Sequence, residues 1–150
     1  MNILEPEQSD IAKLPVSFDR KFSVDCITRT HRQLLLRSDV YNPNGTDHST
    51  RIDIVFKIVK AMKMPFTLPR LEIRLATEEE RQAIQNDWQD AVFKYHYERA
   101  YTILGGATPG YIVAGSAFFA EIDEKEQPQP MSLLYEVEQN FPPKMVYDLI

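Results

Sequence analysis

The chain has 150 residues, of which 43% are hydrophobic and 26% are charged, and its formal net charge is −5. This balance is typical of one globular domain with an apolar core, and it excludes a chain that stays disordered. Acidic residues outnumber basic residues 22 to 17. That excess argues against nucleic acid as a partner, because phosphate binding depends on a basic face.

The N-terminal residues contain no targeting or membrane signal. The stretch MNILEPEQSD is acidic where a signal peptide has a positive segment followed by an apolar one. No apolar run approaches the roughly 18 residues of a membrane span. The single cysteine, Cys26, permits no disulfide within the chain. We therefore expect a cytoplasmic protein with no membrane partner, in which residues 1–19 form an N-terminal arm or a short helix.

An alternation of apolar and polar residues begins at Phe22 and predicts extended structure. Residues 22–27 alternate, and a second apolar cluster follows at 34–36. These residues form two strands joined by a turn near Thr30, or one long strand bent by a bulge. The loop NPNGTDHST that follows is rich in turn-forming residues and predicts an antiparallel hairpin.

The segment RIDIVFKIVK fits both a strand and a helix, because most of residues 52–59 are apolar. Six of these eight residues are Ile, Val or Phe, which favours a strand. Lys57, Lys60 and Lys63 form a basic stripe that is explained most simply by solvated lysines. The alternation in LEIRLAT predicts another strand from Leu71.

The segment TEEERQAIQNDWQDA predicts a helix over about 77–91. Thr77 can cap its first turn, and Glu80 can complete a capping box. Apolar residues at helical spacing predict that one face of this helix lies on the sheet. These residues are Ala83, Ile84, Trp88 and Ala91.

The segment VFKYHYERAYTIL alternates and predicts a half-buried strand over 92–104. YIVAGSAFFAEID predicts a further strand, in which Gly115 marks a bulge or a close neighbour. The glycine-rich GGATPG between them could cradle a phosphate or form a bend. A phosphate-binding loop is followed by a helix, whereas GGATPG is followed by a strand, so it is predicted to be a hairpin loop.

These elements predict one α+β domain over 1–150, with a largely antiparallel sheet of about six strands and one principal helix packed on it. The polar stretch 124–131 is expected to be a solvated connection. The tail then contains SLLYEVE, an edge strand or a short helix, and FPPKMVYDLI, whose apolar residues predict docking onto the domain.

No motif for catalysis or metal binding is evident. His31, His48 and His96 lack the i, i+4 spacing of a helical metal site. Cys26 lies in an apolar alternation, where a thiol is usually buried and inert. The acids beside arginines in RSD and RID are explained by cross-strand ion pairs on a solvated face. We therefore expect no catalytic residues, no metal and no cofactor.

The most suggestive stretch is KYHYERAY. On an extended strand, Tyr95, Tyr97, Arg99 and Tyr101 share one face, where aromatic rings offer contact area and arginine binds an anion. Tyrosine and arginine are also frequent at the energetic centre of protein interfaces. The competing interpretation is a core-facing strand whose hydroxyl groups reach the rim. We take these four residues and Trp88 as candidates for binding a ligand or a partner.

Three classes of function follow from the sequence. The first is a non-catalytic protein-interaction module, such as an oligomeric scaffold, an adaptor or an immunity-type inhibitor, whose partner is another protein or a second copy. Net acidity favours a basic partner by electrostatic steering. The second class is a small-ligand-binding domain with a pocket between the sheet and the Trp88 helix. The third is an enzyme in which the fold brings His31 or His96 next to a carboxylate. We favour the first class.

Overall fold

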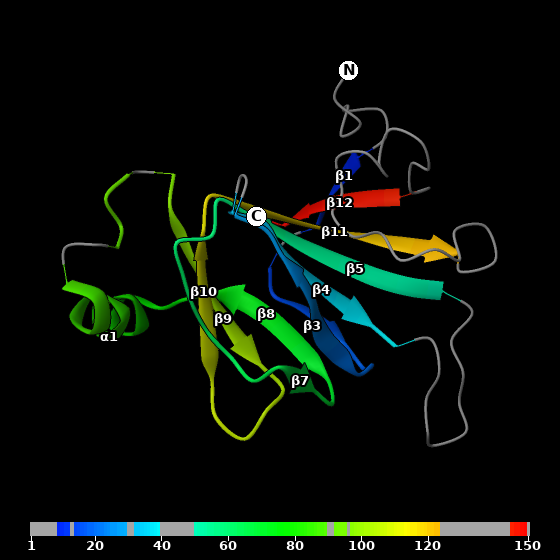
Figure 1. The fold of residues 1–150 in the computed structure, drawn as a ribbon, viewed down its shortest axis with the longest axis horizontal. Helices are drawn as coiled ribbons and strands as arrows, with labels where there is room; N and C mark the ends of the chain where they lie inside the picture. Colours follow the sequence, from blue (N-terminus) through cyan, green and yellow to red (C-terminus); the bar gives the residue numbers. More distant parts are fainter. Residues whose placement is uncertain are drawn as a thin grey trace.

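The computed structural model describes residues 9–12, 14–29, 32–39, 50–89, 92–95, 97–123 and 145–149 (Figure 1). These residues form twelve strands and one helix, which confirms the predicted α+β class. The prediction of a single sheet of about six strands is wrong, because the strands divide into two sheets.

The larger sheet has seven strands. They are β1 (Ser9–Ala12), β3 (Phe22–Ile27), β4 (Leu34–Ser38), β5 (Thr50–Lys57), β7 (Thr67–Leu68), β11 (Ser116–Asp123) and β12 (Met145–Leu149). Their order is β1-β12-β11-β5-β4-β3-β7, and all neighbours are antiparallel except β1 and β12. For residues 22–36, the first of the two alternatives is confirmed, because β3 and β4 are separate antiparallel strands, with a bulge in β3 between Val24 and Cys26. The hairpin predicted around NPNGTDHST is confirmed by the antiparallel pair β4 and β5.

The smaller sheet has five antiparallel strands. They are β2 (Val16–Phe18), β6 (Ala61–Lys63), β8 (Leu71–Leu75), β9 (Arg99–Leu104) and β10 (Gly110–Ala114). Their order is β2-β8-β9-β10-β6. Residues from the 1–19 arm thus contribute a strand to each sheet, and β12 of the C-terminal tail lies between β1 and β11. SLLYEVE, the whole 124–131 stretch and all of NPNGTDHST except Thr50 lie outside the described residues.

The main core lies between the two sheets. Leu36, Ile54 and Phe56 of the larger sheet pack with Ile73 and Ile112 of the smaller sheet in one buried cluster. Fully burying one such side chain stabilises the fold by about 1.5–3 kcal/mol. This apolar layer is therefore the principal reason that the two sheets stay together.

Two corners explain why predicted continuous strands divide between the sheets. β5 leaves the larger sheet at Ile58, whose backbone is left-handed with φ 58°, an unusual conformation for a β-branched residue. β10 passes into β11 at Gly115, the one residue between the two strands. The Gly115 amide donates to the Lys57 carbonyl at 2.9 Å, so the two corners lie against each other. Strands that switch sheets need such bends.

The GGATPG segment is the predicted hairpin loop, because it joins the antiparallel strands β9 and β10. Gly105 has φ 131°, and a side chain on it would collide with the carbonyl group of Arg70. Glycine is thus required at position 105 because the backbone of Arg70 passes close to it, and no anion-binding role is needed to explain it. The strand β10 follows Pro109 directly.

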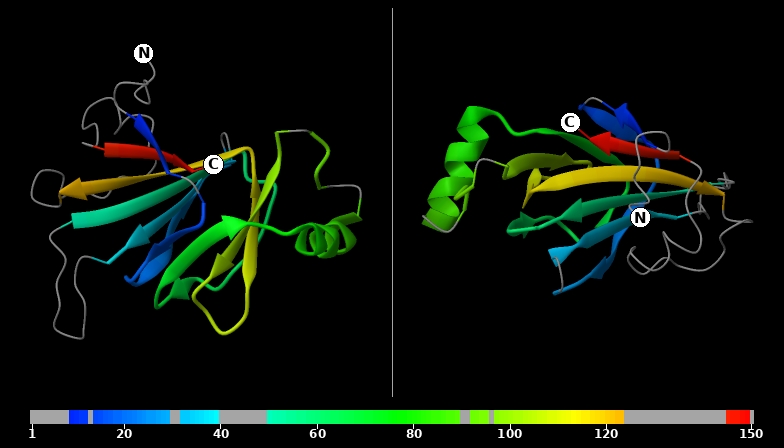
Figure 2. Two further views of the ribbon diagram at one scale, coloured as in Figure 1. Left: turned by 180° about the vertical axis from the view of Figure 1, so that it is seen from behind. Right: turned by 90° about the horizontal axis from the view of Figure 1, so that it is seen from above.

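The helix α1 (Glu78–Trp88) begins as predicted and ends three residues earlier than expected. Its only buried residue is Ile84, which packs against Ala61 and Val113 on the outer face of the smaller sheet. The predicted apolar stripe is wrong for Ala83 and Trp88, which are exposed. Figure 2 shows α1 at one end of the molecule, on the side of the smaller sheet away from the larger one.

The first turn of α1 contains the predicted capping box. Thr77 Oγ1 accepts from the Glu80 amide at 3.1 Å, and Glu80 Oε1 accepts from the Thr77 amide at 2.9 Å. Glu80 also accepts two hydrogen bonds from Arg74, at 2.6 and 2.9 Å. The Arg74 bond lowers the pKa of Glu80 to about 2; burial opposes this shift, and the Thr77 amide adds to it.

We expect Glu80→Gln to remove a pH-dependent part of the stability. The folded pKa of Glu80 is depressed below the usual 4.5. The carboxylate therefore stabilises the fold above about pH 4.5, and this contribution is lost as the pH falls towards about 2. Urea unfolding between pH 7 and pH 2 should show a difference between wild type and variant that is largest at pH 7 and shrinks over that window. Glu79→Gln, at an exposed position in the same turn, should show much less change; equal behaviour of the two variants would contradict the assignment.

Candidate functional site

The predicted strand over 92–104 is wrong in its first half. β9 begins only at Arg99, and Phe93 has a left-handed backbone with φ 54°. The reason is Glu98, whose side chain is buried and whose Oε1 accepts from the Tyr95 amide at 3.2 Å. The Glu98 amide in turn donates to the Tyr95 carbonyl at 3.1 Å. These local bonds replace a strand ladder with a turn.

Lys60 anchors this turn to the sheet. Its Nζ lies 2.8 Å from Glu98 Oε1, and the Glu98 side chain is 2% exposed. Burial alone would raise the pKa of Glu98, but the hydrogen bond and charge of Lys60, with the amides of Tyr95 and Lys94, outweigh it and lower the pKa. Glu98 is therefore ionised at neutral pH. The prediction of a solvated Lys60 is wrong.

The turn presents two tyrosine rings at the corner between the sheets. Tyr95 and Tyr97 stack with centroids 5.4 Å apart and planes 3° apart. A Cβ on Gly115 would lie 3.5 Å from the Tyr97 ring and 3.4 Å from Ile58, so these two side chains meet at the corner, and Tyr95 joins them through its stacking on Tyr97. Ile58, Tyr95 and Tyr97 are 43%, 48% and 42% exposed. We call these three residues the aromatic surface.

Cationic groups surround the aromatic surface. Lys60 Nζ and Lys94 Nζ lie 5.1 and 5.6 Å from the centroid of the Tyr95 ring, within the range of cation–π attraction. Arg99 is also exposed; its backbone lies opposite Ala114, next to Gly115, and its charge acts on the buried Tyr101. The surface thus combines apolar area with positive charge.

The other two candidates lie in different environments. Tyr101 is fully buried and packs edge-to-face on Phe56 at 5.4 Å. Burial raises its pKa, and the nearby charge of Arg99 only partly opposes that shift. Trp88, the last residue of α1, donates a hydrogen bond from its indole N–H to the Tyr111 hydroxyl at 2.7 Å. Tyr101 is thus placed as the core-facing interpretation expects, whereas Tyr95 and Tyr97 are placed as the surface interpretation expects.

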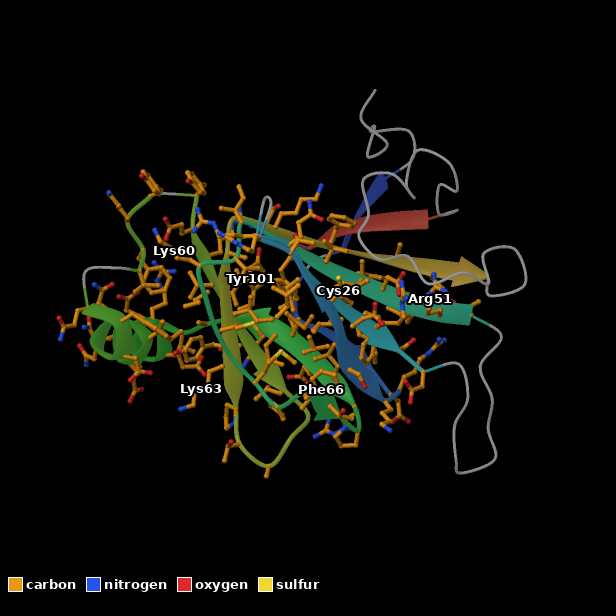
Figure 3. All side chains as sticks on the ribbon, in the orientation of Figure 1. Cys26, Arg51, Lys60, Lys63, Phe66 and Tyr101 are labelled. Atoms are coloured by element: carbon orange, nitrogen blue, oxygen red, sulfur yellow. The ribbon has the colours of Figure 1, made fainter. Side chains whose placement is uncertain are left out.

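A second charged cluster lies on the larger sheet. Asp53 accepts from Arg37 at 2.9 and 3.2 Å and from Arg51 at 3.1 and 3.3 Å, and Asp25 lies 3.6 Å from Arg37. The predicted cross-strand pairing is confirmed, but the predicted solvated face is wrong, because Asp53 and Arg51 are both 2% exposed. Lys60 and Arg51 lie well apart along the molecule (Figure 3). With the Asp53 carboxylate already engaged by two arginines, this cluster has a structural role.

The three histidines considered for catalysis or metal binding, His31, His48 and His96, lie outside the described residues. Within the described ranges, no three His, Cys, Asp or Glu side chains are grouped to hold a metal. Cys26 is half-buried opposite Leu35. The 11-residue α1 is too short and too polar to cross a membrane, and the described residues contain no other α-helix.

The chain matches no protein-family model, no curated protein and no solved structure. The aromatic surface and the charges around it are therefore the observations from which a function can be inferred. Sequence reasoning named Tyr95, Tyr97 and Arg99 but missed Ile58, Lys60 and Glu98. Glu98 gave no signal in the sequence, because it shares the more polar face of the alternation with Lys94 and His96.

Proposed function

We propose that this protein is a non-catalytic protein-interaction module and that the aromatic surface is its contact region. The observation that carries the proposal is the stacked pair of exposed tyrosines beside exposed Ile58. Tyrosine is enriched among the residues that dominate interface energetics. An oligomeric scaffold, an adaptor and an immunity-type inhibitor all require such a surface and no chemical motif.

The rigidity of the surface also supports the proposal. Tyr95 and Tyr97 are held by their mutual stacking and by the buried Glu98–Lys60 pair beneath them. Side chains that are already ordered lose little entropy on binding, so more of their contact energy appears as affinity. We place the interaction in the cytoplasm, because the composition shows no reliance on disulfides.

The alternative of a small-ligand site between sheet and helix has less support. Ile84 is buried between α1 and the smaller sheet, in one cluster with Ala61, Ala100 and Val113. Trp88 lies at the exposed edge of this contact, where its indole is bonded to Tyr111. The apolar and polar groups described between α1 and the sheet are thus already occupied by contacts with each other.

We expect the double variant Tyr95→Ala/Tyr97→Ala to weaken association at least tenfold, which corresponds to about 1.4 kcal/mol. The measurement is sedimentation velocity over a concentration series, together with mass spectrometry of proteins that co-purify from the native cells. Phe66→Ala is the matched control, because Phe66 is an aromatic residue with 69% exposure outside the aromatic surface. If self-association and co-purified proteins are the same for all three proteins, the proposal is wrong.

A further inference from the structure

We propose that the aromatic surface binds an acidic segment of a partner protein. The carboxylates of that segment would pair with Lys94 and Arg99, and its apolar side chains would pack on Ile58 and Tyr97. This inference rests on the proposed function and adds the chemistry of the partner.

The first argument is unsatisfied positive charge. Lys60 uses one of its three N–H donors on Glu98. Lys94 lies by the same Tyr95 ring and has no carboxylate partner among the described residues, and the same holds for Arg99. An incoming carboxylate would form charge-assisted hydrogen bonds with these donors, which are about twice as strong as neutral ones.

The second argument concerns the negative charge at this site. Glu98 contributes a carboxylate, but Lys60 and the Tyr95 amide already occupy its Oε1. Its Oε2 is enclosed, with no hydrogen-bond partner among the described residues. A basic side chain of a partner could therefore not reach this carboxylate without displacing the turn, whereas an acidic one meets exposed cations.

The third argument separates local from overall charge. The net charge of −5 favours a basic partner at long range, as the composition predicts. Exposed charges more than about 8 Å apart are largely screened at physiological salt. Contact at the aromatic surface is therefore governed first by Lys94, which lies by the Tyr95 ring, and then by the exposed Arg99 nearby in the chain. Their positive charge selects acidic groups.

A protein segment fits this surface better than a single-stranded nucleic acid. Non-specific strand binding needs ring faces on which successive bases stack. Tyr95 and Tyr97 turn one face of each ring towards the other, and Ile58 adds an aliphatic contact. The excess of acidic residues further repels a continuous phosphate backbone.

The test uses three fluorescent probes in binding titrations. They are a 14-residue peptide in which glutamate alternates with leucine and phenylalanine, the same peptide with lysine replacing every glutamate, and an oligothymidylate. Each probe is titrated with wild type, Lys94→Glu and Lys63→Glu. Lys63 is the control because its side chain is exposed and lies away from Lys60 (Figure 3). Thermal melting verifies that every variant is folded.

We expect the glutamate peptide to bind at least tenfold more tightly than the other probes and to weaken as salt rises. Lys94→Glu should weaken it at least tenfold and Lys63→Glu less than twofold. The inference is overturned if the glutamate peptide does not bind, if another probe binds as tightly, or if Lys94→Glu has no effect. If any of these results is obtained while Tyr95→Ala/Tyr97→Ala still weakens association at least tenfold, the interaction module stands and only its acidic partner is wrong.

Discussion

Replacing Asp53 with asparagine is expected to lower the free energy of unfolding by about 3–5 kcal/mol. The Asp53 carboxylate accepts hydrogen bonds from both Arg37 and Arg51, and the Arg51 and Asp53 side chains are 3% and 2% exposed. Asp53→Asn removes the negative charge that Arg37 and Arg51 share. Both arginine side chains are largely removed from water, Arg51 more than Arg37. The cost of desolvating a charge is recovered only while its partner is present.

The measurement is urea unfolding at pH 7, with Asp39→Asn as the matched control. Asp39 pairs with Lys21 at 3.7 Å, and both side chains are nearly half exposed. Such a surface pair contributes about 0–1 kcal/mol, so the control should be close to wild type. A loss below about 1 kcal/mol in Asp53→Asn would show that the buried cluster is not a determinant of stability.

Gly105→Ala is expected to destabilise the fold by about 3 kcal/mol or more. The backbone conformation at φ 131° is one that side chains rarely adopt, and strain of this kind costs about 1–3 kcal/mol by itself. The new methyl group would also collide with the backbone carbonyl of Arg70, which cannot rotate away as a side chain can. The hairpin between β9 and β10 would have to shift relative to β8.

Gly115→Ala is the matched control for Gly105→Ala. Its Cβ would lie 3.4–3.5 Å from Ile58 and Tyr97, which is ordinary van der Waals contact. We expect thermal and urea unfolding to place this variant within about 1 kcal/mol of wild type. Equal destabilisation by the two substitutions would mean that general backbone flexibility, and not the contact with Arg70, is responsible.

The candidate site illustrates how far sequence patterns extend. The alternation in KYHYERAY identified Tyr95 and Tyr97 as binding candidates, but it also predicted that the strand starts at residue 92, whereas β9 begins only at Arg99. The alternation could not reveal that Glu98 would be buried, because its partner Lys60 lies 38 residues away in the sequence. Ile58 joined the surface only because the β5 strand turns at that residue.

The sequence by itself determined the elements whose causes are local. The capping box at Thr77 sets the start of α1, and the glycines of GGATPG form the β9–β10 loop. Apolar alternation marks β3 and β8, and the Ile, Val and Phe content of residues 52–59 marks β5. Each of these signals acts between residues a few positions apart.

Only the tertiary structure decided how those elements are shared between two sheets and which sheet faces are covered. A period of two assigns side chains to faces but says nothing about what lies against each face. The buried Arg51–Asp53 pair, the exposed Trp88 and the corners at Ile58 and Gly115 all depend on neighbours distant in the chain. The aromatic surface exists because those two corners bring three such segments together.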